Sequence, residues 1–320
     1  MNRTLTLPNP TSVLSAFLLA LMLAAFLPFA VQAQDSTATT ANAEARTQFS
    51  ALLEEATTFG EDGTAEGKVQ AGEKFVEAGM VAKDSNDGEL GERYVNAMEN
   101  ATKAFMDAGS MYVDAEDYGA GAEQFLRAAE VSAMIENPEL QGKAFYNASV
   151  AYVSLKDFDS ALSSIDSAIV LLPDDLNYLY VRGVTLRSKG DNAGAAEVFT
   201  ELKTKATEAG DEAMATKADE NMGRTYLLAA RDALQAEDYA QAIKELDEAA
   251  PFLGEDDKTL NTFYANAYYR LGVNQVQAEQ FASAKRSLNA AIQHANKSDK
   301  GQIVKGAQAQ LDYIAQVEAQ

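Results

Sequence analysis

The sequence of 320 residues has no cysteine, no tryptophan and a single histidine. Without cysteine the chain cannot form disulfides, thiolate zinc sites, Fe–S clusters or cysteine nucleophiles. His294 has no second imidazole with which to share a zinc ion, and no motif suggests a nucleophile and an acid around it. We therefore interpret His294 as a structural residue near a helix end that interacts with the helix dipole. No catalytic residue, cofactor or metal site is expected.

Positive charge is scarce as well. The chain has 26 Lys and Arg against 48 Asp and Glu, which gives a formal net charge of -22. Neutralising phosphates needs clustered cations, and the sequence shows no such cluster, so neither nucleic acid nor an anionic membrane surface is expected as a partner. The acidic excess keeps a protein soluble and could favour basic partners; a solvated surface is the simpler interpretation.

The chain has one long hydrophobic run, at its N-terminus. Arg3 and the terminal amine precede an apolar stretch from Val13 to Ala30, and Ala33 satisfies the small-residue rule for cleavage. We expect residues 1–33 to be a signal peptide. An uncleaved anchor is the alternative, because the run approaches the ~20 residues that span a bilayer. Cleavage predicts an exported bacterial protein, periplasmic or secreted, without stable membrane insertion.

The rest of the chain divides by composition and periodicity. Residues 34–43 are rich in Ser, Thr and Ala and are predicted to form a flexible linker. Residues 44–101 are predicted to be helices that could form a degenerate repeat, 102–296 about five repeats, and 297–320 a C-terminal capping helix. No stretch alternates with period two, so we expect an all-α fold.

Few prolines interrupt these helices. Three of the six, Pro138, Pro173 and Pro251, stand where helices are predicted to end. Asp157 is expected to cap the helix that follows it, and Asp174 to cap the helix after Pro173.

A short signature recurs between Tyr118 and Ala284. An acidic or polar residue precedes an aromatic residue or Asn, two residues follow, then comes Ala, and a large apolar residue stands four places later. The copies begin at Asp157, Asp191, Asp238 and Gln280, and a looser copy begins at Asp117. Tandem units of this kind predict stacked helical hairpins, which usually bind macromolecules rather than catalyse reactions.

The clearest unit runs from Gly142 to Pro173 and has small residues and aromatics on its first helix, then Ala, a large apolar residue, Ala and Pro on its second. Its residues are Phe145, Ala148, Ser149, Tyr152, Ala161, Ile165, Ala168 and Pro173. This pattern resembles the tetratricopeptide repeat (TPR). The resemblance implies a right-handed solenoid of helical hairpins.

The spacing departs from the TPR family. The markers Gly121, Ala161, Ala195, Ala242 and Ala284 lie 40, 34, 47 and 42 residues apart, and only the second interval has the family length. We therefore expect irregular repeats, with longer first helices or extended links over about 211–236 and 258–278.

The resemblance also implies a concave groove lined by first helices. Tyr residues recur at equivalent places in three repeats with Val four residues later, and Arg replaces Val in a fourth. The candidate groove residues are Tyr146, Val150, Tyr180, Val184, Arg231, Tyr269 and Val273. An aromatic and apolar groove suits a peptide or an amphipathic helix. Packing of the Tyr residues against neighbouring helices is an equal alternative. The Lys and Asn arrangement with which TPR proteins clamp a C-terminal carboxylate is missing.

Carboxylate pairs are the remaining candidates for chemistry. Asp174-Asp175, Asp256-Asp257 and Glu61-Asp62 each lie at a predicted loop or helix start, where capping explains them. We therefore expect an exported, non-catalytic scaffold that binds other proteins or peptides in cell-envelope assembly or maintenance. A self-assembling structural solenoid and a carboxylate-based hydrolase are the alternatives.

Overall fold

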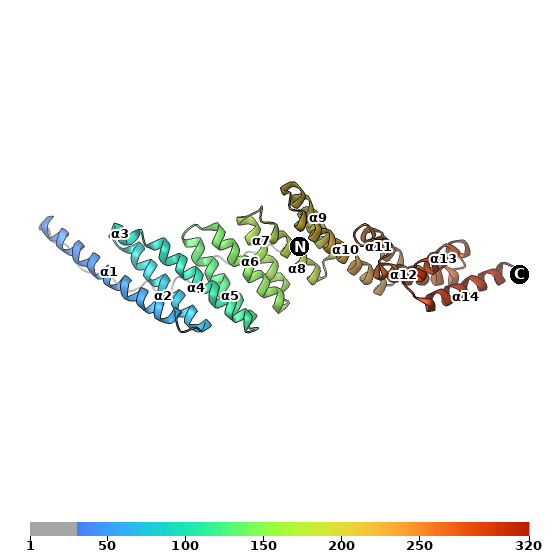
Figure 1. Ribbon diagram of the computed structural model, residues 1–320, viewed down its shortest axis with the longest axis horizontal. Coiled ribbons are helices and arrows are strands. Elements are labelled where there is room, and N and C mark those ends of the chain that lie inside the picture. The colour runs from blue at the N-terminus through green and yellow to red at the C-terminus, as the bar shows by residue number, and fades with distance from the viewer. Residues whose placement is uncertain (1–30, 320) are drawn as a thin grey trace, which may run out of the picture.

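The described part of the chain, residues 31–319, is all-α in this computed structural model and forms an elongated stack of helices (Figure 1). The helices are α1 (Val31–Gly60), α2 (Ala65–Asp84), α3 (Gly88–Gly91), α4 (Tyr94–Asp114), α5 (Tyr118–Met134), α6 (Pro138–Leu155), α7 (Phe158–Leu171), α8 (Leu176–Lys189), α9 (Asn192–Ala209), α10 (Glu212–Gln235), α11 (Tyr239–Leu253), α12 (Lys258–Gln277), α13 (Phe281–Lys297) and α14 (Gly301–Glu318). Side chains are described from residue 39 onward. The predicted signal peptide lies outside the described residues, apart from residues 31–33 at the start of α1.

Each long helix packs against its neighbours along the chain, and this builds a row of hairpins. The hairpins are α4–α5, α6–α7, α8–α9, α10–α11 and α12–α13; α1 and α2 pair before them, and α14 closes the row against α12 and α13. The hydrophobic core follows the stack as successive clusters instead of gathering at one centre. The predicted all-α hairpin solenoid of TPR type is confirmed.

Helices of successive hairpins lie closer together on one side of the stack than on the other. The first helices of successive hairpins, α4, α6, α8, α10 and α12, contact one another directly, whereas successive second helices do not approach to the same degree. In a curved stack, the helices that approach each other lie on the inside of the bend. We call the side formed by the first helices the inner face.

One close contact recurs inside the hairpins. A small residue on the first helix stands sixteen residues before a large residue on the second, in the pairs Gly109–Phe125, Ser149–Ile165, Gly183–Phe199, Ala230–Leu246 and Gly272–Leu288. A Cβ atom at Gly109 or Gly183 would lie 2.7 Å from the Phe ring, and one at Gly272 would lie 2.8 Å from Leu288. At these three positions only glycine leaves room for the large partner, since interiors are close-packed.

Aspartates begin most second helices, as the signature predicts. The side chains of Asp117, Asp157, Asp191 and Asp238 each accept a hydrogen bond from the backbone N–H three residues later. The Asp157 cap is therefore confirmed, while Gln280 makes no such bond.

The predicted Asp174 cap is wrong. Asp175 caps α8 instead, accepting from the N–H of Asn177 at 3.0 Å, because α8 begins at Leu176, one residue later than expected.

Two other boundaries also differ from the prediction. Residues 34–43 belong to helix α1 and do not form a separate linker. Ala has the highest helix propensity, and one turn further along α1 the side chain of Ala45 packs against a cluster that contains Ala78 and Ala82 of α2. Helix α4 crosses the boundary expected at residue 102.

The three prolines take three different positions. Pro173 follows the end of α7, as predicted, whereas Pro138 is the first residue of α6. Pro251 lies inside the last turn of α11, where its missing N–H removes one hydrogen bond and the helix still runs to Leu253.

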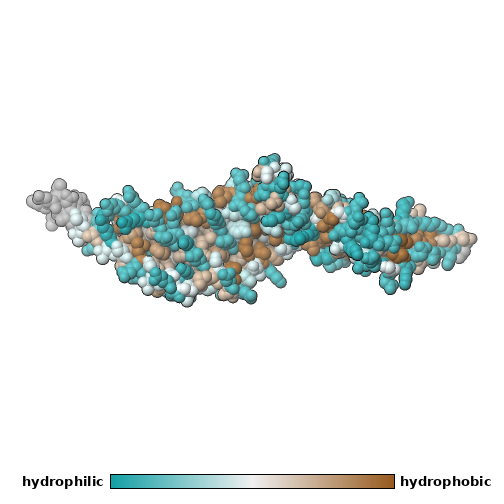
Figure 2. Space-filling view, viewed as in Figure 1, coloured by the Kyte–Doolittle hydropathy of each residue, from teal (hydrophilic) through white to brown (hydrophobic). Residues whose placement is uncertain are grey.

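The unequal spacing has the cause that the sequence suggested. Helices α10 and α12 contain 24 and 20 residues, against 14 in α8, so longer first helices account for the wider intervals. Within the described residues, no helix combines the length and apolar composition that crossing a bilayer requires. One face of the molecule is mainly hydrophilic, with apolar residues in separate patches (Figure 2).

Candidate protein-binding groove

The three tyrosines predicted to line the groove pack against neighbouring helices, Tyr146 and Tyr269 against the next unit of the stack and Tyr180 within its own hairpin. The Tyr146 ring is 5.5 Å from that of Tyr178 on α8, and the Tyr180 ring is 6.4 Å from that of Phe199 on α9. Tyr269 packs against α14, where its hydroxyl would lie 2.7 Å from a Cβ at Gly306. All three rings are half-buried. The structure thus shows the packing role that the sequence left open for these residues.

The other predicted positions are spread along four first helices. Val150 is 40% exposed, while Val184 and Val273 are half-buried. The seven residues do not form one continuous pocket. Arg231 of α10 is the one among them that lines a hollow with an apolar floor.

That hollow lies on the inner face and is lined by α8, α10 and α12. Three arginines, Arg187, Arg224 and Arg231, surround an apolar floor. The floor consists of Leu227, Leu228 and Phe263, and the hollow has a volume of about 430 Å³.

A second hollow of about 360 Å³ continues from the first. It shares Arg231 and Phe263 with the first hollow and adds Arg270 of α12. We call the two together the arginine groove. It holds four of the ten arginines of the chain, although the protein as a whole is strongly acidic.

The four guanidinium groups differ in how they are held. Arg187 is half-buried, donates from Nη1 to Asn221 Oδ1 at 2.6 Å, and lies 5.8 Å from the centre of the Phe199 ring. Burial lowers the pKa of Arg187, and the nearby positive charge of Arg224 acts in the same direction. Arg187 is therefore a cation that is held in place and only partly hydrated.

The remaining three arginines are exposed. Arg231 pairs with its neighbour Asp232 at 3.1 Å, an exposed contact of the kind that contributes little free energy. Among the described residues, no ion pair is formed by Arg224 or Arg270. Free guanidinium groups bind carboxylates through paired hydrogen bonds, and we therefore regard this groove as the best candidate for ligand binding.

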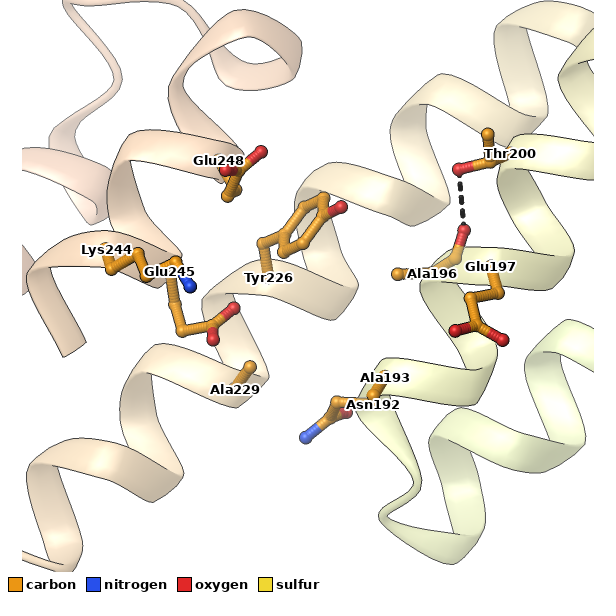
Figure 3. A pocket seen from close by; sticks show the side chains of 10 residues that line it. All are labelled: Asn192, Ala193, Ala196, Glu197, Thr200, Tyr226, Ala229, Lys244, Glu245 and Glu248. Atoms are coloured by element: carbon orange, nitrogen blue, oxygen red, sulfur yellow. Dashed lines mark hydrogen bonds between the residues drawn. The ribbon is translucent and has the colours of Figure 1, made fainter. Parts of the chain in front are cut away.

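A cleft of opposite charge lies across helix α10. It has a volume of about 630 Å³ and runs between α9, α10 and α11. Figure 3 shows Tyr226 of α10 between Glu197 on one side and Glu245 and Glu248 on the other. Burial, together with the charges of Glu248 and Glu245, raises the pKa of Tyr226. At ~100° per residue, Tyr226 points about 160° away from Arg224, so α10 separates the two surfaces.

His294 lies in an aromatic cluster. Its ring stacks 4.5 Å from that of Tyr264 and 5.8 Å from that of Tyr268, and Nδ1 is 2.8 Å from Asn261 Oδ1. Burial lowers the pKa of His294, and Lys297 adds to this effect. These contacts fit the structural role that the sequence predicts, and burial favours the neutral imidazole.

Among the described residues, the carboxyl groups with clearly shifted pKa values are all shifted downward. They are Asp62, Asp87, Glu139, Asp157 and Asp299, and in each the largest cause is a hydrogen bond to the charged form. A general acid in a hydrolase needs the opposite shift. Within the described residues, no group of His, Asp or Glu side chains is arranged to hold a metal ion.

Sequence reasoning found Arg231 and missed the other arginines of the groove. A signal was present, because Arg187, Arg224, Arg231 and Arg270 all fall on predicted first helices of three consecutive repeats. Leu227 occupies the place that Tyr146, Tyr180 and Tyr269 hold in other repeats, four residues before Arg231. With Leu instead of Tyr at this position of α10, Leu227 forms part of the apolar floor.

No family model and no curated protein matches the chain. Among solved structures, a TPR repeats protein from Bacteroides fragilis is 15% identical, with a TM-score of 0.43, and the match covers 65% of this chain and 97% of that one. YrrB, described as a TPR protein with an unusual peptide-binding site, is 23% identical, with a TM-score of 0.35 over 58% of this chain and 88% of that one.

A third similar structure is the TPR2AB domain of yeast Sti1 in complex with pHSP90. It is 17% identical, with a TM-score of 0.31, and the match covers 84% of this chain and 99% of that domain. All three are similar to this chain in fold alone. The TPR-like fold of the chain rests on its own hairpin packing.

Proposed function

We propose that the protein is a non-catalytic scaffold that binds a peptide or helix of a partner protein in the arginine groove. The observation that carries this proposal is the groove itself, a basic hollow with an apolar floor that crosses three consecutive first helices of an acidic chain. Guanidinium groups and apolar side chains side by side provide both polar specificity and hydrophobic free energy for a peptide. We thus still propose binding on the inner face, as the sequence predicts, but we place the centre of the site at α10.

Site-specific photo-cross-linking tests this proposal directly. A photoreactive phenylalanine analogue replaces Leu228 in the groove, and in a matched control it replaces Glu208, an exposed residue of the second helix α9. After irradiation in cells, we expect discrete cross-linked proteins from position 228 and none from position 208. Equal patterns at both positions would contradict binding in the groove.

Export is part of the proposed function and depends on the N-terminal segment. Residues 1–33 have the charged start, apolar run and small-residue end of a secretory signal. We propose that the mature protein begins at Gln34 and acts in the cell envelope. N-terminal sequencing of protein recovered from the periplasmic fraction checks this, and an intact Met1 in membrane pellets would point to the uncleaved anchor.

Self-assembly through the ends of the solenoid is the alternative that a specific observation favours. Tyr313 of α14, the last helix among the described residues, is 52% exposed. Light scattering over a range of protein concentrations tests this alternative, because self-assembly through the ends predicts a molecular mass that rises with concentration and binding in the groove requires no such rise.

A further inference from the structure

We propose that the arginine groove binds an acidic segment of a partner protein, in which side-chain carboxylates flank a large apolar residue. This inference rests on the proposed function and names the chemistry of its partner. It is drawn from the charge, burial and shape of the groove.

The local charge of the groove opposes the net charge of the chain. Arg224 and Arg270 have no ion pair among the described residues, and Arg187 is bound to a neutral amide. The net charge of -22 would repel an acidic ligand at long range. At physiological ionic strength, however, charges beyond about 8 Å are largely screened, so the guanidinium groups next to the ligand decide the sign of the interaction.

The kind of cation favours carboxylates. Every cationic side chain that lines the arginine groove is an arginine, whereas the chain as a whole contains more lysines than arginines. A guanidinium presents a planar pair of donors that matches a carboxylate, and it is less strongly hydrated than an ammonium group. Arg187 is already partly dehydrated and held by Asn221, so little side-chain freedom remains to be lost when an anion binds.

The floor of the groove requires an apolar group in the ligand. Leu227, Leu228 and Phe263 lie between the arginines, and the hollow of about 430 Å³ accommodates one Leu or Phe side chain. A purely anionic ligand such as a phosphate backbone would leave this surface uncovered. The groove therefore favours a protein segment over a nucleic acid.

The span of the groove sets the length of that segment. The groove runs from α8 across α10 to α12, and neighbouring helices that pack together lie about 8–10 Å apart. The distance across three helices is therefore roughly 20 Å, which an extended chain covers in about six residues. A segment with acids near both ends and at least one large apolar residue in the middle places carboxylates beside Arg187 and Arg270.

Binding of defined peptides measures this preference. The probe is a fluorescein-labelled peptide, Glu-Asp-Glu-Leu-Phe-Asp-Glu-Asp, with an amidated C-terminus, and its binding to the purified full chain is followed by fluorescence anisotropy. We expect binding that weakens at least about tenfold when all acids become amides, or when Leu and Phe become Ser. A peptide with a free C-terminal carboxylate should bind about equally. Binding by the free-acid form alone would overturn the assignment to side-chain carboxylates.

Paired protein variants locate the binding. Arg224→Gln with Arg270→Gln removes the two unpaired cations of the groove, and we expect at least about a tenfold loss of affinity. The matched control, Arg286→Gln with Lys305→Gln, removes the same charge from α13 and α14 and should change affinity less than about twofold. All four side chains are exposed, so folding should be unaffected, and circular dichroism checks this.

The outcomes separate the two proposals. Equal weakening by both double variants would show that only net charge matters and would overturn the inference. A single-stranded oligonucleotide that binds more tightly than the peptide, or concentration-dependent dimers abolished by Arg224→Gln with Arg270→Gln, would also overturn it. If cross-linking from position 228 still captures a protein in those cases, the scaffold function stands and the chemistry of its partner is different.

Discussion

The hairpins α8–α9 and α12–α13 have the same close contact between their two helices but different turns. Both place a glycine on the first helix against a large residue sixteen positions later, Gly183 against Phe199 and Gly272 against Leu288. The turn of α8–α9 has Gly190 with φ 92°, followed by Asp191 as helix cap. The turn of α12–α13 has Glu279 with φ 56° in the same left-handed region, and its second helix has no side-chain cap.

The comparison shows which features the fold requires. The close contact between the two helices is present in both hairpins, because neither helix can bury its apolar stripe without it. The favourable turn and cap are present in only one. Packing between helices therefore decides the fold, and local turn chemistry adjusts its stability. Four predictions test that ranking.

The largest effect is expected at the close contact. Gly183→Ala places a Cβ 2.7 Å from the Phe199 ring, and we expect the free energy of unfolding to fall by about 1–3 kcal/mol despite the better helix propensity of Ala. Gly272→Ala should cost a similar amount, because its Cβ would lie 2.8 Å from Leu288 Cγ and 3.3 Å from the Leu288 backbone N. Denaturant unfolding followed by circular dichroism measures both.

A compensating variant provides the control. Gly183→Ala with Phe199→Leu recreates the pair Ala230–Leu246 that hairpin α10–α11 already uses, and it should recover part of the lost stability. No recovery in the double variant would show that the cost comes from elsewhere than this contact.

The second effect concerns the helix caps. Asp191→Ala removes the hydrogen bond to the N–H of Gly194 and should lower stability by about 1 kcal/mol. Gln280→Asp supplies the missing cap of α13 and should raise stability by about 0.5–1 kcal/mol. Thermal melting of both variants checks this prediction; a Gln280→Asp variant that melts at the wild-type temperature would refute it.

The third effect concerns the left-handed turn residue. Gly190→Ala introduces a Cβ where φ is 92° and should destabilise the protein by about 1 kcal/mol. Glu279→Gly should do the reverse by roughly 0.5–1 kcal/mol, because glycine adopts this region without steric cost. Opposite shifts in melting temperature are expected, and shifts of the same sign would contradict the turn argument.

The smallest effect is a pH dependence confined to the terminal hairpin. Burial lowers the pKa of His294 in the folded protein, while the unfolded value stays near ~6.5. The neutral form is therefore favoured in the fold, so its contribution to stability is complete above pH ~6.5 and is lost as the pH falls toward the lowered folded value.

Melting temperatures at pH 7.5 and 5.5 measure this effect. The wild-type protein should lose more stability between the two values than His294→Phe, which keeps an aromatic ring beside Tyr264. Hairpin α8–α9 contains no histidine, and its variants should show the same pH dependence as the wild type. An identical pH dependence in His294→Phe would contradict the assignment.

The sequence alone was sufficient for the class of fold and for much of its local detail. Periodicity of about 3.6 residues, the recurring Asp–aromatic–Ala signature and the rarity of proline predict helical hairpins, since each depends only on residues within one or two turns of each other. The cap at Asp157 and the long first helices that became α10 and α12 followed from the same local reasoning.

Only the tertiary structure determines which side chains of different helices pack together and which residues line the grooves between the helices. Nothing local distinguishes Tyr180, which packs toward Phe199, from a tyrosine that faces an open groove. The meeting of Arg187, Arg224 and Arg270 depends on the rotation of three helices about their own axes, which is set by how the Gly–Phe and Ala–Leu contacts interlock. Helix formation is governed by neighbours in sequence, whereas the surface that binds is formed by residues that become neighbours only after the hairpins stack.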